Sequence, residues 1–255
     1  MITIPMAGLS SRFKKAGYTK PKYMLEAGGK TLFELSVQSF NKYFDEIPFM
    51  FIMRDECNTF DFVKQQCKTL GIKKTIFHVL ASPTRGQADT VRIGLETNGI
   101  VSDEPLTIFN IDSFIPGFSY PEWLDNCDGY LEVFHDDGEH WSFIKPDSRN
   151  ADFVAYTAEK QRISDLCSNG LYHFSRCSDF LEAATHQSST ENKDLQGGEM
   201  YVAPLYNYLI SSGRKIRYNI IPKDKMFFCG TPDEYDFFIQ NSIEQYTQQS
   251  SGAEL

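Results

Sequence analysis

The chain has 255 residues, 41% of them hydrophobic, and a formal net charge of −9, which suits one α/β domain with a sizeable core or two small ones. It has no Lys/Arg-rich run and no apolar run of about eighteen residues, so neither nucleic acid nor a membrane is an expected partner. Its six cysteines include no C-x-x-C pair and no signal peptide is recognisable, which predicts reduced thiols and a soluble, cytoplasmic protein.

The start of the chain combines an apolar run with a small-residue loop and two cations. Ile2–Met6 is predicted to form a short buried strand. The loop that follows consists of Ala7, Gly8, Leu9, Ser10 and Ser11. Small residues let backbone N–H groups approach an anion closely, so this loop is a candidate phosphate site. Arg12 and Lys22 would add positive charge on the same side.

Helices and strands are predicted to alternate as far as residue 111. The expected helices cover 31–43, 60–70 and 88–96, and the expected buried strands cover 49–53, 75–80 and 106–111. Thr31 and Glu34 form a capping box that would start the first helix. This alternation predicts βαβ units and a mostly parallel, Rossmann-like sheet, in which ligands bind outside the carboxyl ends of the strands.

The pattern changes near residue 130, where shorter candidate strands replace the alternation. Strands are expected at 130–134, 141–144, 153–157, 170–174 and 215–221, and helices at 178–185 and 201–212. We therefore expect a small antiparallel extension that covers the open edge of the sheet. Residues 187–198 are polar and end in glycine, which predicts a mobile loop, and 247–255 are expected to form a frayed tail. Between them, Asp233 and Glu234 are expected to start a final helix.

Asp112 directly follows the strand predicted to end at Ile111, which would place its carboxylate at the sheet edge that faces residues 7–12. Mg²⁺ prefers one or two carboxylates together with phosphate oxygens and water, so Asp112 is a candidate metal ligand. An N-cap or an Asx-turn at the strand exit is the structural alternative. The residues after it are Ser113 and Phe114, whereas a glycosyltransferase more often carries D-x-D here.

Polar side chains also stand at the ends of other predicted elements. Gln87 lies at the start of a predicted helix, and its amide offers both a donor and an acceptor. Glu159 and Lys160 follow a predicted strand, and Glu199 lies in a later Gly-Glu segment. The structural alternatives are a solvent-facing glutamine in a helix first turn and an exposed charged turn.

Taken in order, these segments resemble the sugar-1-phosphate nucleotidylyltransferase (sugar-nucleotide pyrophosphorylase) family, whose pattern begins with G-x-G-x-R and, about ten residues later, P-K. The matching segments are Gly8–Arg12, Pro21-Lys22, Gly86-Gln87-Ala88, Asp112, Glu159-Lys160, Gly170–Phe174 and Gly230-Thr231-Pro232. The resemblance spans most of the chain. It implies a GT-A-like nucleotidyltransferase fold in a single domain, 1–255, with a nucleotide-binding half at 1–125 and an acceptor-binding half at 126–245.

The resemblance implies transfer of a nucleoside monophosphate from an NTP to a sugar 1-phosphate. The products would be an NDP-sugar, for capsule or surface polysaccharide synthesis, and pyrophosphate. The implied partners are the NTP and a phosphorylated small-molecule acceptor, Mg²⁺ is the implied cofactor, and a homo-oligomer stays open. By resemblance, residues 7–11 and Gln87 bind the nucleotide, with Gln87 at the base, and Asp112 holds the metal. The phosphates are assigned to Arg12, Lys22 and Lys160, and the acceptor to Glu159, Lys160 and Glu199.

Two positions depart from the family pattern. The second glycine of G-x-G is Ser10, which costs on the order of 1 kcal/mol if this position needs a positive φ. The second metal-binding Asp that many members carry before G-T-P is replaced by Phe228. Asp224 or Asp233 could substitute for it, Asp112 could hold the metal with phosphates and water alone, or activity could be reduced or lost.

Three further functions stay open at the level of sequence. The acceptor could be a non-sugar phosphate such as phosphocholine, with CTP as the donor. The chain could instead be a GT-A glycosyltransferase that uses an NDP-sugar. It could also be a non-catalytic nucleotide-binding regulator, an alternative that the departures at Ser10 and Phe228 motivate.

Overall fold

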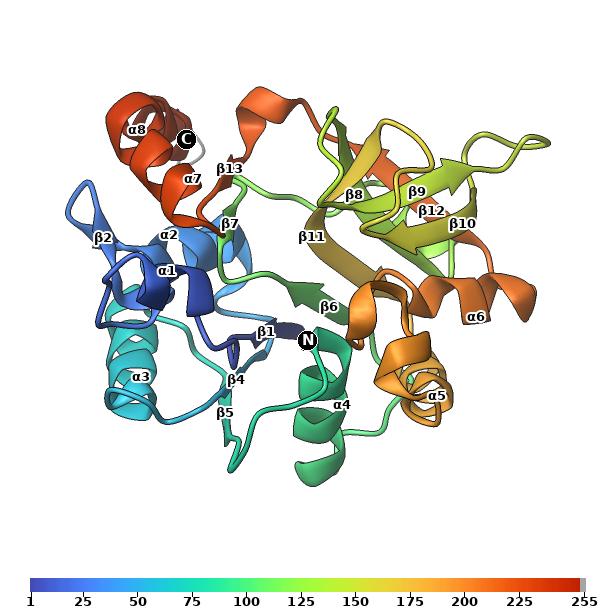
Figure 1. The fold of residues 1–255 in the computed structure, drawn as a ribbon, viewed down its shortest axis with the longest axis horizontal. Coiled ribbons are helices and arrows are strands. Elements are labelled where there is room, and N and C mark those ends of the chain that lie inside the picture. The colour runs from blue at the N-terminus through green and yellow to red at the C-terminus, as the bar shows by residue number, and fades with distance from the viewer. Residues whose placement is uncertain (253–255) are drawn as a thin grey trace.

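The computed structural model describes residues 1–252, which fold around a nine-stranded sheet (Figure 1). The strands are β1 (Ile2–Pro5), β2 (Glu26–Ala27), β3 (Lys30–Thr31), β4 (Phe49–Met53), β5 (Thr75–Val79), β6 (Leu106–Phe109), β7 (Ser113–Phe114), β8 (Gly129–His135), β9 (Ser142–Pro146), β10 (Val154–Glu159), β11 (Leu166–Phe174), β12 (Ile216–Ile220) and β13 (Phe227–Phe228). The α-helices are α1 (Ser11–Lys15), α2 (Leu32–Val37), α3 (Thr59–Leu70), α4 (Gln87–Thr97), α5 (Cys177–Ser188), α6 (Leu205–Ser211), α7 (Pro232–Phe237) and α8 (Ile243–Gly252). None of the helices in residues 1–252 is long and apolar enough to cross a membrane.

The parallel half of the sheet consists of β6, β1, β4 and β5. β1 pairs in parallel with β4 and β6, and β4 pairs in parallel with β5. Alternate residues of β4 enter two separate apolar clusters, one shared with α4 and the other with α2 and α3. Burial on both faces explains why the predicted strand at 49–53 is a continuous apolar run. The predicted mostly parallel, Rossmann-like sheet is confirmed.

An antiparallel extension continues this sheet on the β6 side (Figure 1). β11 pairs antiparallel with β6, β8 and β9, and β10 pairs antiparallel with β9. One detail differs from the expectation, because β12 runs parallel to β8. The chain reaches β12 through α5 and α6, and such a helical connection permits parallel pairing.

The C-terminal helices return to the N-terminal half of the molecule. Figure 1 shows α7 and α8 beside α1 and α2, and the apolar cluster between them joins Phe13 and Leu35 to Phe238 and Tyr246. A capping box on Thr231 starts α7, and Asp233 and Glu234 lie in its first turn, so the predicted helix start is confirmed. Helix α8 continues to Gly252, so the predicted frayed tail is wrong as far as that residue. Residues 253–255 lie outside the described range.

The segment predicted as a mobile loop is held in place. Residues 187–198 contain the end of α5 and the 3₁₀ turns η4 (Asn192–Asp194) and η5 (Gln196–Gly198). The Arg85 guanidinium donates hydrogen bonds to the Ser188 carbonyl (2.7 Å), the Thr190 carbonyl and Asn192 Oδ1 (2.8 Å). This arginine therefore fixes the segment beside the start of α4.

Candidate active site

Two adjoining cavities open at the carboxyl ends of β1 and β6, where the parallel and antiparallel halves of the sheet meet. The loop cavity is lined by residues 7–12 together with Gln87, Asp112 and Glu199. The aromatic cavity is lined by Trp141, Tyr172 and Phe228 together with Glu159. Both cavities share Leu9, Ser10, Ser11, Arg12, Lys22, Gln87, Asn110, Asp112, Lys160 and Tyr201. Every residue to which the family resemblance assigns a role thus lines one cavity or both.

Ser10, which stands where the family pattern has its second glycine, adopts a left-handed backbone conformation. Its φ of 49° and ψ of 35° lie in the left-handed region. A serine pays on the order of 1 kcal/mol for this conformation. Its hydroxyl accepts a hydrogen bond from the Lys22 backbone N–H at 3.4 Å, which ties the loop to the Pro21-Lys22 segment.

Lys22 and Asp112 form an ion pair between Nζ and Oδ2, and each side chain is 21% exposed. The residue that follows β13 holds Asp112 in turn, because the Asp112 carbonyl accepts a hydrogen bond from the Cys229 N–H at 2.8 Å. Arg12 is exposed at the mouth of both cavities, and no residue in the range 1–252 pairs with its guanidinium. Two cations and one carboxylate therefore meet beside the small-residue loop.

Glu159 forms a buried carboxylate in the aromatic cavity. It ends β10, is 5% exposed, and accepts a hydrogen bond from the Ser142 hydroxyl. Burial raises the pKa of Glu159, while the Ser142 bond and the Lys160 charge act against the increase. The Glu159 N–H donates to Gln196 Oε1 at 2.9 Å, so η5 also fixes this residue.

Lys160 is a second strained residue of the site. Its φ is 53°, a conformation that a non-glycine residue rarely adopts. The ammonium donates to the Tyr201 hydroxyl and lies 4.5 Å from the centroid of that ring. Strain of this kind persists where the surrounding structure enforces it and concentrates at ligand sites.

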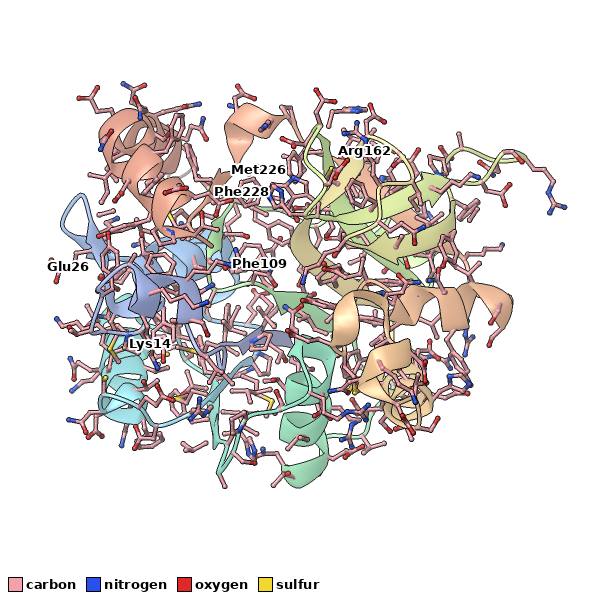
Figure 2. The ribbon with its side chains drawn as sticks, in the orientation of Figure 1. Lys14, Glu26, Phe109, Arg162, Met226 and Phe228 are labelled. Atoms are coloured by element: carbon pink, nitrogen blue, oxygen red, sulfur yellow. The ribbon has the colours of Figure 1, made fainter. Side chains whose placement is uncertain are left out.

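An aromatic wall lines the same cavity as Glu159 and Lys160. The Trp141 and Phe228 rings are 4.9 Å apart, and Phe134 lies 5.3 Å from Phe228 behind them. Figure 2 shows Phe228 beside Met226, between the C-terminal helices and the antiparallel strands. Phe228 therefore occupies the cavity with an apolar ring at the position where the family pattern often carries a carboxylate.

The donor set near Asp112 suits a divalent cation. Neither Asp224 nor Asp233, the candidates for a second carboxylate, is among the residues that line the two cavities, but Glu234 is. A methyl group at Gly230 would lie 3.0 Å from Asp112 Oδ2 and 3.2 Å from Glu234 Oε2, so the two carboxylates flank this glycine. Glu234 Oε2 already accepts the N–H groups of Gly230 (2.8 Å) and Thr231 (2.9 Å). Two oxygen ligands from the protein fit Mg²⁺, which completes its shell with phosphate and water.

Sequence reasoning did not find several lining residues. These are Asn110, His140, Trp141, Ser142, Asn169, Tyr172, Tyr201, Phe228 as a cavity wall, and Glu234. Asn110 carried a usable signal, since it is a polar residue within the otherwise apolar run at 106–111. The aromatic residues of the cavity wall carried no such signal in the sequence, because only the pairing of distant strands brings them together.

The fold has counterparts among solved structures. A nucleoside-diphosphate-sugar pyrophosphorylase from Vibrio cholerae RC9 is 50% identical over 94% of this chain and 100% of its own, with a TM-score of 0.90. The inositol-1-phosphate CTP transferase from T. maritima is 14% identical over 99% of this chain and 95% of its own, with a TM-score of 0.72. A putative glucose-1-phosphate thymidylyltransferase from Bacillus anthracis is 15% identical over 98% of this chain and 94% of its own, with a TM-score of 0.68. No family model and no curated relative matches the chain.

Proposed function

Because the chain belongs to the nucleoside-diphosphate-sugar pyrophosphorylases, we propose that it transfers a nucleoside monophosphate from an NTP to a sugar 1-phosphate. The products are an NDP-sugar and pyrophosphate. One observation carries this proposal: Arg12, Lys22, Asp112 and Lys160 all line the two adjoining cavities that open beside the small-residue loop. An acidic chain that places its cations in this way can bring two mutually repelling phosphorylated compounds together.

The reaction needs no protein nucleophile. An anionic oxygen of the acceptor phosphate attacks the α-phosphorus, a new P–O bond forms, and the bond to the pyrophosphate leaving group breaks. The protein's contribution is positioning and neutralisation of charge. Arg12 holds the β- and γ-phosphates, Lys22 holds the α-phosphate, and Lys160 holds the attacking phosphate. The ammonium of Lys160 reaches Tyr201, which also lines both cavities.

Asp112 and Glu234 are the residues that would hold Mg²⁺. When bound, the ion neutralises charge on the phosphate oxygens. Lys22, which is ion-paired with Asp112, would bind the α-phosphate beside this metal site. Glu234 takes the part of the carboxylate that the family pattern places at Phe228, and its capping contacts keep its side chain beside Gly230.

The acceptor is assigned to the aromatic cavity. Glu159, held by Ser142, accepts hydrogen bonds from acceptor hydroxyls, and Glu199 contributes from the adjoining loop cavity. A second candidate function, a cytidylyltransferase for a phosphorylated amine such as phosphocholine, is favoured by the Trp141 and Phe228 rings beside a buried carboxylate, because aromatic faces and carboxylates attract cations.

We also place this reaction in the cytoplasm and assign its product to capsule or surface polysaccharide synthesis. The cytoplasmic assignment is supported by the six cysteines, all of which are free thiols, as expected in a reducing compartment. The assignment to polysaccharide synthesis rests on family analogy alone.

Pyrophosphate release tests the proposal. Four NTPs and dTTP are each incubated with Mg²⁺ and with sugar 1-phosphates, phosphocholine or phosphoethanolamine. Release with a sugar 1-phosphate supports the main proposal, and release with CTP and phosphocholine alone supports the second candidate. Binding of an NTP with no pyrophosphate from any pair would identify a non-catalytic regulator and refute both.

A further inference from the structure

Gln87, the residue assigned to the base, is held by a neighbouring side chain. Its Nε2 donates a hydrogen bond to Asn110 Oδ1. Gln87 begins α4, Asn110 follows β6, and both line the loop cavity and the aromatic cavity. No other hydrogen bond within residues 1–252 engages the Gln87 amide. With Nε2 occupied, the amide presents the acceptor Oε1 to a ligand.

Asn110 is itself fixed through its backbone. Its N–H donates to the Gly170 carbonyl at 3.2 Å, and its carbonyl accepts from Ser36 Oγ at 3.2 Å and from the Ser113 N–H at 3.4 Å. Figure 2 shows the preceding residue, Phe109, near the centre of the molecule. The position of Asn110 is therefore set by β11 on one side and by α2 on the other.

Gly170 provides the space that the Asn110 amide fills. Its φ is +93°, and a methyl group there would lie 2.5 Å from Asn110 Cγ and 3.0 Å from Asn110 Cβ. Contacts this short do not occur between real side chains. A side chain at position 170 would displace the amide that holds Gln87, so the glycine is part of the arrangement.

A buried carboxylate anchors the irregular part of β11 that contains Gly170. The pairing of β11 with β8 shifts register between Ser168 and Tyr172. Asn169 fixes this bulge, because its Oδ1 accepts the Leu171 N–H at 3.0 Å and its Nδ2 donates to Glu132 at 3.2 Å. Glu132 is 1% exposed. A hydrogen-bonded path thus runs from the core of the antiparallel extension to the wall of the cavity.

We propose that Asn110 is a positioning residue for base selection, an inference that rests on the proposed place of the base beside Gln87. Asn110 holds the Gln87 amide in one orientation, and Gln87 then selects a base that presents an N–H donor to Oε1. A freely rotating amide offers its donor or its acceptor equally well and accepts either type of base edge. When the Gln87 amide is held in one orientation, a base that presents an acceptor to Oε1 cannot form this hydrogen bond. In a half-buried site the missing bond lowers the affinity for that nucleotide by about tenfold.

Binding of NTPs to three variants tests this role. Calorimetric dissociation constants for UTP, CTP, dTTP, ATP and GTP are measured on the wild type, Asn110→Ala and Asn110→Asp. Asn98→Ala, at the opposite end of α4, is the matched control. We expect the wild type to prefer one pyrimidine nucleotide over the other by about tenfold. Asn110→Ala should reduce the preference to below about threefold, because the amide is then free to turn.

Asn110→Asp separates positioning from simple damage. The carboxylate introduced at position 110 still accepts a hydrogen bond from Gln87 Nε2, so the base preference should persist. The added negative charge should weaken the binding of every NTP by a similar factor. An unchanged preference in Asn110→Ala, an equal loss in both variants, or no preference in the wild type would overturn the inference. These dissociation constants are measured without turnover. If their ratios changed as expected in a protein that releases no pyrophosphate, the proposed function would be refuted and the role of Asn110 in base selection would still be supported.

Discussion

Replacing Lys22 with alanine tests the centre of the proposed chemistry. The Lys22 ammonium is 21% exposed and paired with Asp112. On the proposed assignment, its removal deletes a donor to the α-phosphate and leaves a partly buried carboxylate beside the triphosphate. Loss of one donor that acts in the transition state costs roughly 3–4 kcal/mol of barrier, so we expect kcat in a continuous pyrophosphate-release assay to fall by roughly 10² to 10³.

Two controls isolate this effect. Lys20→Ala removes an exposed lysine close by in sequence and should leave turnover within about twofold of wild type. Lys22→Arg keeps a positive charge beside Asp112, so it should retain more turnover than Lys22→Ala if the lysine acts mainly by neutralising charge. Stability should change little, because a partly exposed ion pair contributes at most about 1 kcal/mol. Turnover of Lys22→Ala within about threefold of wild type would refute the assigned role.

Three further changes test other features of the structure. Asp112→Asn should weaken Mn²⁺ binding, followed by electron paramagnetic resonance with a non-reacting NTP analogue, by at least about tenfold, and unchanged binding would exclude Asp112 as a ligand. Burial raises the pKa of Glu132 to about 7 from 4.5, so the folded state keeps a proton that the unfolded state has lost between these values. Stability should therefore fall by roughly 3 kcal/mol as pH rises through that window, and urea titrations of Glu132→Gln should lack this component. Thr231→Val should lower the free energy of unfolding by about 1 kcal/mol through loss of the α7 cap, whereas Thr231→Ser should retain it.

The sequence predicted the parts of the fold that depend on local pattern. The largely apolar segments at 49–53 and 106–109 form buried strands because both faces of this part of the sheet are covered, and the second strand ends two residues before the predicted Ile111. The Thr31 capping box started α2 as expected. Asp112 was predicted at the cavity because parallel strands present their carboxyl ends at one edge.

Features that depend on strand register were beyond the sequence. The contact between Gly170 and Asn110 exists because β11 bulges where it pairs with β8. Phe228 meets Trp141 only after β13 pairs with β7. Glu159 and Lys160 were found through family resemblance, and neither periodicity nor composition distinguishes them from an exposed charged turn.

The junction between β6 and β11 limits how this protein can be re-engineered. Leu171 pairs with Phe109 across it, so the parallel and antiparallel halves share one hydrogen-bonded ladder. A chimera that grafts residues 126–245 from a relative would have to rebuild that ladder strand by strand. Exchange of the short stretches at 140–142, 159–160 and 199–201, which end strands or connect elements around the cavities, leaves the junction intact. Altered acceptor choice is therefore better sought by swapping loops than by shuffling halves.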